Sequence, residues 1–406
     1  MESAPGSSVI AVEGGISPGC AVQAAGSVTT SGTVQARHGA VAGAAALTDV
    51  LQDRISETNQ AAIRNLVPAL EKARAYRGRG GEVVRQAACR LLACVAAAKT
   101  WQFKDATAVR YLQTVDECAR HTTEMILFAA ADALRVLARF RLKPEMCLKC
   151  VDNYIASLKK GDEMISARRG SALCLGAIPV AVLGERRREV LEVLCKEAKG
   201  LECPGGKDQD DPTTRVYAVL SLGRLVLATS ITPEETALVV STLEATMRDY
   251  ATDRRGDVGS WVREISMEVV AALLDVQKRG PSASEPSLPD AATSTRLLAL
   301  LMQQAVEKID RLRERSFGLL RRLMCGAVGD GPSNILELAY RRVCHSESYD
   351  SMGIANSFCQ AAPAIHVERA AWPPAQAATL TAALRRKDDA LNDEAKKDPA
   401  SSSTAE

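Results

Sequence analysis

A stretch that could do chemistry, RRGDVGSWVREISMEVVAALL at residues 254–274, places an acid, a glycine and a tryptophan within five positions just before a helix. Such a loop could hold a catalytic carboxylate, or it could be a structural corner. No histidine, serine nucleophile or second convergent carboxylate is identifiable near Asp257, so this loop does not assemble a catalytic set. Gly259 permits a tight backbone path, and Trp261 can cover the end of a helix pair. The sequence therefore favours a structural corner, and we predict that the chain is not an enzyme.

Two other segments could carry chemistry, and neither has the residues it would need. Cys147 and Cys150 form an isolated CxxC motif, and the nearest further ligand candidates, Cys118 and His121, lie too far upstream for a compact zinc knuckle. The basic, glycine-rich segment YRGRGGEVVR at residues 76–85 lacks the order of a phosphate-binding P-loop, and no strand precedes it. We therefore predict no catalytic, cofactor or metal site, and we interpret residues 76–85 as a loop between helices.

Composition limits the partners and the compartment. The chain of 406 residues has 51 Lys and Arg against 49 Asp and Glu, so its overall charge would not attract nucleic acid or an anionic membrane. No segment reaches the run of about 20 apolar residues that a membrane span requires. The twelve cysteines are scattered, and several fall on apolar helical stripes, as is typical of a reducing compartment. We expect a cytoplasmic protein that binds neither nucleic acid nor membranes.

Hydrophobic periodicity and capping signals predict the helices that must position the loop. Small or apolar residues recur with the period of an amphipathic helix at Val262, Ile265, Ser266, Val269, Val270, Leu273 and Leu274. Upstream, Thr232, Pro233 and Glu235 have the spacing of an N-cap, a first helical position and a capping box. A pair of helices is therefore predicted over residues 232–276.

The same pattern recurs along the chain. An arginine is followed by a small residue three positions on and an aliphatic residue four further on, in segments that contain Arg85, Arg168, Arg215, Arg263 and Arg313. Leu127 takes the arginine position in one further segment, and the six copies repeat every 41 to 50 residues. HEAT and armadillo repeats have periods of about 40 to 47 residues. We therefore predict an all-α fold, an α-solenoid of HEAT- or armadillo-type helix pairs in one right-handed superhelix without a β-sheet.

Four regions are expected along the chain. Residues 1–46 are rich in Gly, Ala, Ser, Thr and Val with almost no charge, and we interpret them as a disordered, low-complexity leader. Residues 47–345 are predicted to form the solenoid. Residues 346–396 are expected to be an irregular segment with a terminal helix, and residues 397–406 a disordered polar tail.

Three copies also place an acid six residues before the arginine, in the pairs Asp162 and Arg168, Asp257 and Arg263, and Glu307 and Arg313. Six helical steps turn a side chain by about 240°, so the two residues cannot meet on one helix. In the first two pairs the acid is expected in the turn before the helix, where a carboxylate can cap exposed amides. We predict that these acids and arginines form a ladder between stacked repeats.

Two of these segments resemble a known family. The blocks RAYRGRGGEVVRQAACRLL and MRDYATDRRGDVGSWVREISME, followed by QQAVEKIDRLRERS, are similar to the C-terminal HEAT-repeat region of the tubulin-folding cofactor D family. Family members also carry a long N-terminal solenoid, for which this sequence has no counterpart. The family-motif residues that could bind a partner are Tyr76, Arg77, Gly78, Gly80 and Gly81 in the first block and Asp249, Tyr250, Asp253, Arg255, Gly256, Asp257, Gly259 and Trp261 in the second.

The resemblance implies a tubulin-folding chaperone without enzymatic activity of its own. Family members bind β-tubulin and form a complex with tubulin-folding cofactors E and C, α-tubulin and an ADP-ribosylation-factor-like small GTPase. In that complex they help to stimulate GTP hydrolysis by tubulin. The implied location is the cytoplasm, and association with microtubules stays open. The main alternative from another class is a general α-solenoid adaptor whose cargo is not tubulin.

Overall fold

The computed structural model describes residues 32–77, 79–160, 163–200, 210–228, 232–279 and 289–325. The chain divides into two compact units, Met1–Pro144 and Glu145–Glu406, so the span predicted as a single solenoid contains a unit boundary. The remaining predicted regions lie outside the described residues: residues 1–31 of the leader, residues 326–345 of the solenoid, the segment 346–396 and the tail 397–406.

The first unit consists of helices packed side by side. Its elements are α2 (Val34–Leu51), the 3-10 helix η1 (Gln52–Arg54), α3 (Glu57–Lys72), α4 (Gly81–Ala97), α5 (Asp105–Cys118) and α6 (Glu124–Phe140). Helix α4 packs against both α2 and α6, and it also contacts α3 and α5. Its apolar residues Val84, Leu91, Leu92 and Val95 are completely buried. This central helix therefore supplies much of the core of the first unit.

Helix α2 corrects the predicted extent of the leader, because it begins at Val34 and not after residue 46. The Thr33 hydroxyl caps the helix by accepting a hydrogen bond from the Ala36 amide at 3.3 Å. Val41, Ala44, Ala45 and Thr48 form a buried stripe with helical spacing. The segment resembles a low-complexity sequence because it is made of alanine and glycine with little charge, yet alanine is the strongest helix former.

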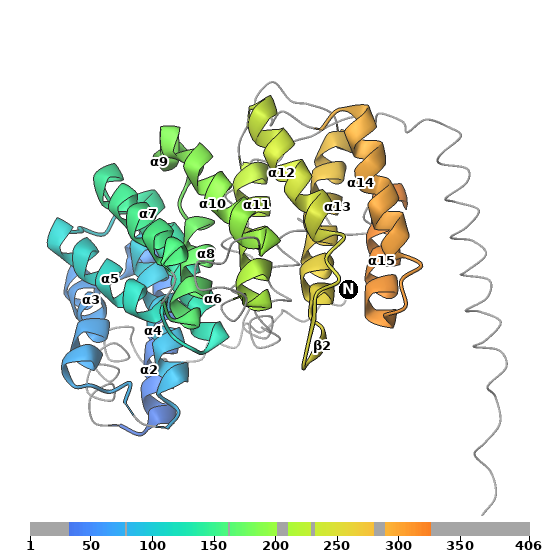
Figure 1. The fold of residues 1–406 in the computed structure, drawn as a ribbon. Helices are drawn as coiled ribbons and strands as arrows, with labels where there is room; N and C mark the ends of the chain where they lie inside the picture. Colours follow the sequence, from blue (N-terminus) through green and yellow to red (C-terminus); the bar gives the residue numbers. More distant parts are fainter. Residues whose placement is uncertain are drawn as a thin grey trace, which may run out of the picture. The chain divides into compact units, whose positions relative to one another are not determined.

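The second unit repeats a two-helix pattern. Its elements are α7 (Pro144–Lys159), α8 (Ile165–Leu175), α9 (Val180–Leu183), the 3-10 helix η2 (Gly184–Arg186), α10 (Arg187–Lys199), α11 (Pro212–Ala228), α12 (Pro233–Thr246), α13 (Gly259–Arg279), α14 (Ala291–Gln304) and α15 (Asp310–Cys325). Helices α8, α11, α13 and α15 contact one another in that order, and α10 and α12 pack together beside them (Figure 1). The described parts of both units are thus all-α, with helices stacked as in an α-solenoid, as the sequence predicts.

The repeated sequence pattern is the buried face of these stacked helices. Every small residue three positions after the repeat position is buried, namely Ala88, Ser171, Ala218, Ser266 and Ser316. All three serines of this set donate hydrogen bonds; the Ser266 hydroxyl, for example, donates to the Thr246 hydroxyl at 2.8 Å. A small residue at this position lets the partner helix approach closely. The predicted stripe from Val262 to Leu274 is likewise buried throughout.

The loop between α12 and α13 contains the only strands among the described residues. β1 (Thr252–Asp253) pairs antiparallel with β2 (Gly256–Asp257), with Thr252 opposite Asp257 and Asp253 opposite Gly256. The prediction of a chain without a β-sheet is wrong at this place. Strands of two residues are too short to show an alternating pattern in the sequence. Gly256 has φ +104°, a conformation that glycine adopts without the strain other residues incur.

Candidate functional site

Two loops hold most residues of the family motif, and we call them the first corner (residues 73–81) and the second corner (residues 249–259). The second corner joins α12 to α13 and contains seven of the thirteen motif residues. Its backbone turns sharply at Gly259, the first residue of α13. A Cβ at this position would lie 2.8 Å from both the Ala251 amide nitrogen and the Asp249 carbonyl carbon. The Gly259 amide also donates to the Ala251 carbonyl at 2.9 Å. Glycine is therefore required here for close backbone approach, which is the structural role expected from the sequence.

Asp257 and Arg263 meet within one repeat and not between stacked repeats. One Asp257 carboxylate oxygen accepts a hydrogen bond from the Ser260 amide at 2.9 Å, and the other accepts from Arg263 Nη2 at 2.9 Å. Arg263 is fully buried, and its guanidinium carbon lies 4.1 Å from the centre of the Tyr250 ring. The helical rotation argument does not apply, because Asp257 lies in the hairpin before the helix and can reach the first turn.

Of the other two predicted pairs, Glu307 and Arg313 form no ion pair with each other, and the pair of Asp162 and Arg168 stays a prediction. Asp162 lies outside the described residues, and Arg168 makes a bidentate contact with Glu197 of α10 at 2.8 and 2.9 Å. Arg313 pairs with the carboxylate of Asp310. The Glu307 carboxylate instead accepts a hydrogen bond from the Tyr250 hydroxyl at 2.8 Å, a contact between two successive repeats.

The repeat arginines of the second unit share a different role, which the sequence did not predict. Each donates to a backbone carbonyl at or just after the end of the preceding helix: Arg168 to Leu158 at 2.8 Å, Arg215 to Ala198 at 3.3 Å, Arg263 to Asp249, and Arg313 to Glu307 at 2.9 Å. The last carbonyls of a helix lack partners in that helix and carry partial negative charge. The repeated arginine therefore joins the two helices of its own repeat, and the acid that accompanies it varies.

Ion pairs between successive repeats do form. Arg168 of α8 pairs with Glu197 of α10, and Arg215 of α11 pairs with Asp249 beyond α12. The next repeats use residues that were not predicted. Arg311 and Arg315 of α15 contact Glu264 and Glu268 of α13 at 3.2 and 2.6 Å. The two acids are one helical turn apart, and so are the two arginines, so that the four side chains form two parallel rungs. Glu268 is completely buried. In both pairs the arginine follows the acid by 47 residues, and this repeated spacing is the sequence signal that could have predicted the two contacts.

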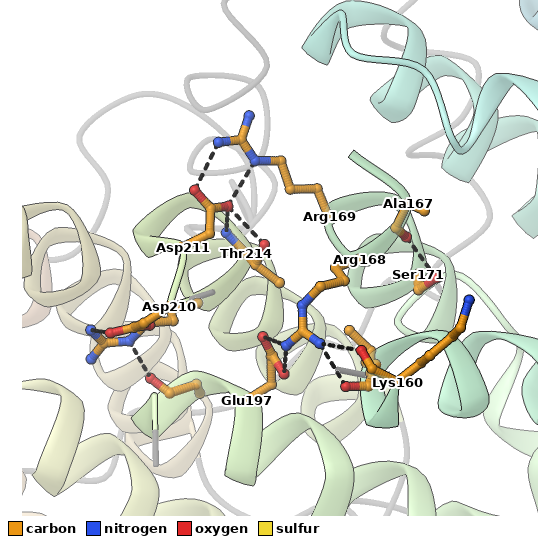
Figure 2. Close-up of polar contacts among 12 residues, drawn as sticks. Lys160, Ala167, Arg168, Arg169, Ser171, Glu197, Asp210, Asp211 and Thr214 are labelled. Atoms are coloured by element: carbon orange, nitrogen blue, oxygen red, sulfur yellow. Dashed lines mark hydrogen bonds and ion pairs between the residues drawn. The ribbon is translucent and has the colours of Figure 1, made fainter. Parts of the chain in front are cut away.

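Neighbouring arginines on α8 anchor two different carboxylates, as Figure 2 shows. Arg169 contacts both oxygens of Asp211 at 2.8 Å, and the Thr214 amide donates to Asp211 at 2.9 Å. Burial acts to raise the pKa of Asp211, but the hydrogen bonds from Arg169 and Thr214 outweigh burial and the pKa is lowered. Burial dominates at Glu197, whose pKa is raised despite the contact with Arg168.

The tip of the second corner is the exposed part of this site. The Asp253 carboxylate accepts hydrogen bonds from the Arg255 amide at 2.7 Å and from Arg255 Nη2 at 2.6 Å. The Arg255 guanidinium lies 5.2 Å from the centre of the half-buried Trp261 ring. The hydrogen bonds to Asp253 raise the pKa of Arg255, and the charges of Asp211 and Arg169 also act on it.

The first corner, defined as residues 73–81, precedes α4 in the first unit, and Gly78 lies outside the described residues. A Cβ on Gly81 would lie 2.7 Å from the Tyr76 carbonyl carbon. Arg85 lies over the Tyr76 ring at 5.0 Å and donates to Glu117 of α5 at 3.2 Å. Gly80 has φ +85° and precedes α4 as its N-cap. Arg77, the remaining predicted residue, is exposed.

The CxxC pair and its surroundings show how the cysteines are used. Cys147 and Cys150 are both buried on α7, and burial raises the pKa of the Cys147 thiol to about 11. Across the described part of the chain, no group of three or more His, Cys, Asp and Glu side chains could hold a metal ion.

In the same part, no single helix is long and apolar enough to cross a membrane. The bent pair Ile165–Leu175 and Val180–Lys199, with an angle of 97°, meets these criteria only as a pair.

Among known proteins, the chain has a distant relative of established name. No protein-family model matches the sequence. Tubulin-specific chaperone D of Dictyostelium discoideum is 23% identical over 249 residues, covering 52% of this chain and 16% of that protein. The match therefore spans a small part of the relative's length. A solved structure of an engineered protein overlays 84% of this chain and 98% of its own with 12% identity, but its TM-score of 0.31 is too low to carry an argument.

Proposed function

We propose that this chain is a tubulin-folding chaperone that acts as a scaffold and performs no chemistry of its own. The observation that carries the proposal is the similarity to tubulin-specific chaperone D over about half of the chain. A stack of helix pairs supports it, because such stacks bind partners over surfaces assembled from several repeats. The hydrogen bonds of Asp257 also support it, since they hold the corner backbone in place.

In this role the chain binds β-tubulin and helps to assemble the α/β-tubulin heterodimer. Its proposed partners are tubulin-folding cofactors E and C and an ADP-ribosylation-factor-like small GTPase. Stimulation of GTP hydrolysis belongs to the assembled complex in this proposal, so no arginine of this chain is assigned as a catalytic finger. The proposed location is the cytoplasm, with microtubules as a further site.

The tip of the second corner is the surface that we propose for contact with the partner. Tyr250 is 47% exposed, Arg254 and Arg255 are exposed, and Arg255 covers the half-buried Trp261. Tyrosine, tryptophan and arginine dominate the residues that contribute most to binding at protein interfaces. Two exposed arginines at a hairpin tip would meet an acidic surface, and the affinity should decrease with salt as these charges are screened.

A capture experiment with the full chain tests this proposal. The immobilised chain is incubated with cell extract, and bound tubulin and cofactor E are measured by immunoblot at low and physiological salt. We expect the parent chain to capture tubulin and the double variant Arg254→Glu, Arg255→Glu to capture less. The matched control, Arg54→Glu with Lys149→Glu, reverses two exposed charges elsewhere and should capture as much as the parent. Absence of tubulin from the parent's bound fraction would favour the general adaptor, and an equal loss in the control would remove the hairpin tip as the contact.

A further inference from the structure

The end of α3 and the first corner expose a group of cations that the folded chain does not neutralise. Lys72, Arg74, Arg77 and Arg79 lie within eight positions, and all four side chains are exposed. No carboxylate of the described residues forms an ion pair with any of them. We call these four residues the basic corner.

The backbone beneath the basic corner is held in a defined shape. The Arg74 amide donates to the Glu71 carbonyl at 2.9 Å, and the Arg77 amide donates to the Arg74 carbonyl at 3.1 Å. Arg37 of α2 donates to the Ala75 carbonyl at 3.4 Å. Arg74 has φ +51°, a left-handed conformation that is unfavourable for a residue with a Cβ. The side chains therefore project from a constrained loop, which limits the entropy that they lose when they bind.

Glu71 and Glu82 flank the basic corner in the sequence, and neither forms an ion pair with one of its four cations. Glu71 accepts a hydrogen bond from the Thr114 hydroxyl, and Glu117 is paired with Arg85 at 3.2 Å. Glu82 is exposed in the first turn of α4, where the helix dipole favours a negative charge. Four like charges in one short segment repel one another, and this repulsion is relieved when an anionic partner binds.

We propose that the basic corner binds an acidic peptide segment of a partner protein, rich in glutamate or aspartate. Three of its four cations are arginines, whose planar guanidinium groups fit carboxylates through paired hydrogen bonds. A single-stranded nucleic acid would also need exposed aromatic rings on which bases stack. The aromatic ring of the first corner, Tyr76, lies under the Arg85 guanidinium, and its hydroxyl is buried. A peptide carboxylate is therefore the better match for this surface.

This inference goes beyond the proposed function, because it concerns the chemistry of one surface in the first unit and holds for any partner with such a segment. It is tested with the full chain and a fluorescently labelled polyglutamate peptide, by fluorescence anisotropy at low and physiological salt. The variant Lys72→Gln, Arg74→Gln, Arg77→Gln, Arg79→Gln should bind the peptide roughly tenfold more weakly than the parent. Because all four side chains are exposed, the variant is expected to fold, and circular dichroism checks this.

A matched control separates the basic corner from net charge. The variant Arg54→Gln, Lys104→Gln, Lys149→Gln, Lys308→Gln also removes four exposed cations and should bind the peptide as the parent does. Equal weakening in both variants, or unchanged binding in the first, would overturn the proposal. Tighter binding of a single-stranded RNA of equal charge, lost in the same variant, would also overturn it in favour of a nucleic-acid site. Tubulin capture is a separate readout, so failure of the proposed function would leave the peptide result interpretable.

Discussion

The two corners share their backbone design, although they lie in different units. In each, a glycine begins a helix where a Cβ would collide with the backbone, at Gly81 and at Gly259. In each, an arginine of the following helix lies over the ring of a preceding tyrosine, at 5.0 Å in the first corner and 4.1 Å in the second. Both corners therefore combine a close backbone approach at a glycine with a contact between an arginine and a tyrosine ring.

The corners differ in charge. The second corner contains Asp249, Asp253 and Asp257, and each carboxylate contacts an arginine, at Arg215, Arg255 and Arg263 respectively. The first corner contains no acid between residues 73 and 81, and its arginines are exposed. The second corner therefore pairs its carboxylates with arginines, whereas the first corner exposes arginines without a carboxylate among residues 73–81.

The largest expected effect tests the shared backbone design. Gly81→Ala should lower the free energy of unfolding by about 3 kcal/mol or more, because the new methyl group would overlap the Tyr76 backbone, which cannot move without displacing α4. Gly259→Ala should be destabilising by a smaller amount. Urea denaturation followed by circular dichroism measures both.

The control for this prediction is a pair of glycines with open surroundings. At Gly39 and Gly43 of α2, no other atom lies within 4 Å of the place that a Cβ would take, so Gly39→Ala and Gly43→Ala should each stabilise by about 0.5 to 1 kcal/mol. If Gly81→Ala were as well tolerated as these two, the close approach in the first corner would not be a requirement.

An intermediate effect is expected where the second corner differs from the first. Asp257→Ala and Arg263→Ala should each lower the free energy of unfolding by about 1 to 3 kcal/mol, because each leaves a buried or half-buried partner without its ion pair. The two effects should overlap in a double-mutant cycle. The exposed pair Asp253 and Arg255 is the control, with an expected cost of about 0 to 1 kcal/mol for either substitution. Full additivity of the first pair would contradict the contact between Asp257 and Arg263.

The smallest expected effect depends on pH. Asp211→Asn should lower the free energy of unfolding by about 1 to 2 kcal/mol at neutral pH, because it weakens the contact with Arg169 and the cap on Thr214. Since the pKa of Asp211 is lowered in the folded state, ionised Asp211 stabilises the fold above the ordinary carboxyl pKa of about 4. That contribution is lost as the pH falls through the lowered pKa. Denaturation curves at several pH values should therefore converge for parent and variant in acid, and a difference independent of pH would contradict the role of the charge.

Local signals made much of the fold predictable from the sequence. The capping box at Thr232 is present as predicted, with the Thr232 amide donating to Glu235 at 2.9 Å and the Glu235 amide donating to the Thr232 hydroxyl at 3.2 Å. The apolar stripe of α13 is buried as predicted. Both features depend on residues a few positions apart, so the sequence contains the whole signal. The hairpin and the start of α2 were missed because short strands and alanine-rich helices lack a distinctive pattern.

The partners of the arginines could not be predicted, because they are set by packing between helices. Arg168 contacts Glu197, which lies 29 residues later on α10, and no local spacing predicts that contact. Arg263 was matched to the right acid, but the contact was assigned to stacked repeats because a short hairpin was not expected. The carbonyl contacts of the arginines depend on where the preceding helix ends, which sequence patterns locate poorly.

The most direct test of the proposed scaffold function uses the purified full chain with purified tubulin and GTP. We predict a complex in the micromolar range, on the order of −8 kcal/mol, that weakens as salt increases, since the match covers only 16% of the relative's length. We also predict no GTP turnover by the chain alone. Analytical ultracentrifugation of the chain mixed with tubulin measures the first quantity, and a phosphate-release assay on the chain without tubulin measures the second. Turnover of GTP by the isolated chain, or absence of a complex at concentrations far above the micromolar range, would contradict the proposed function.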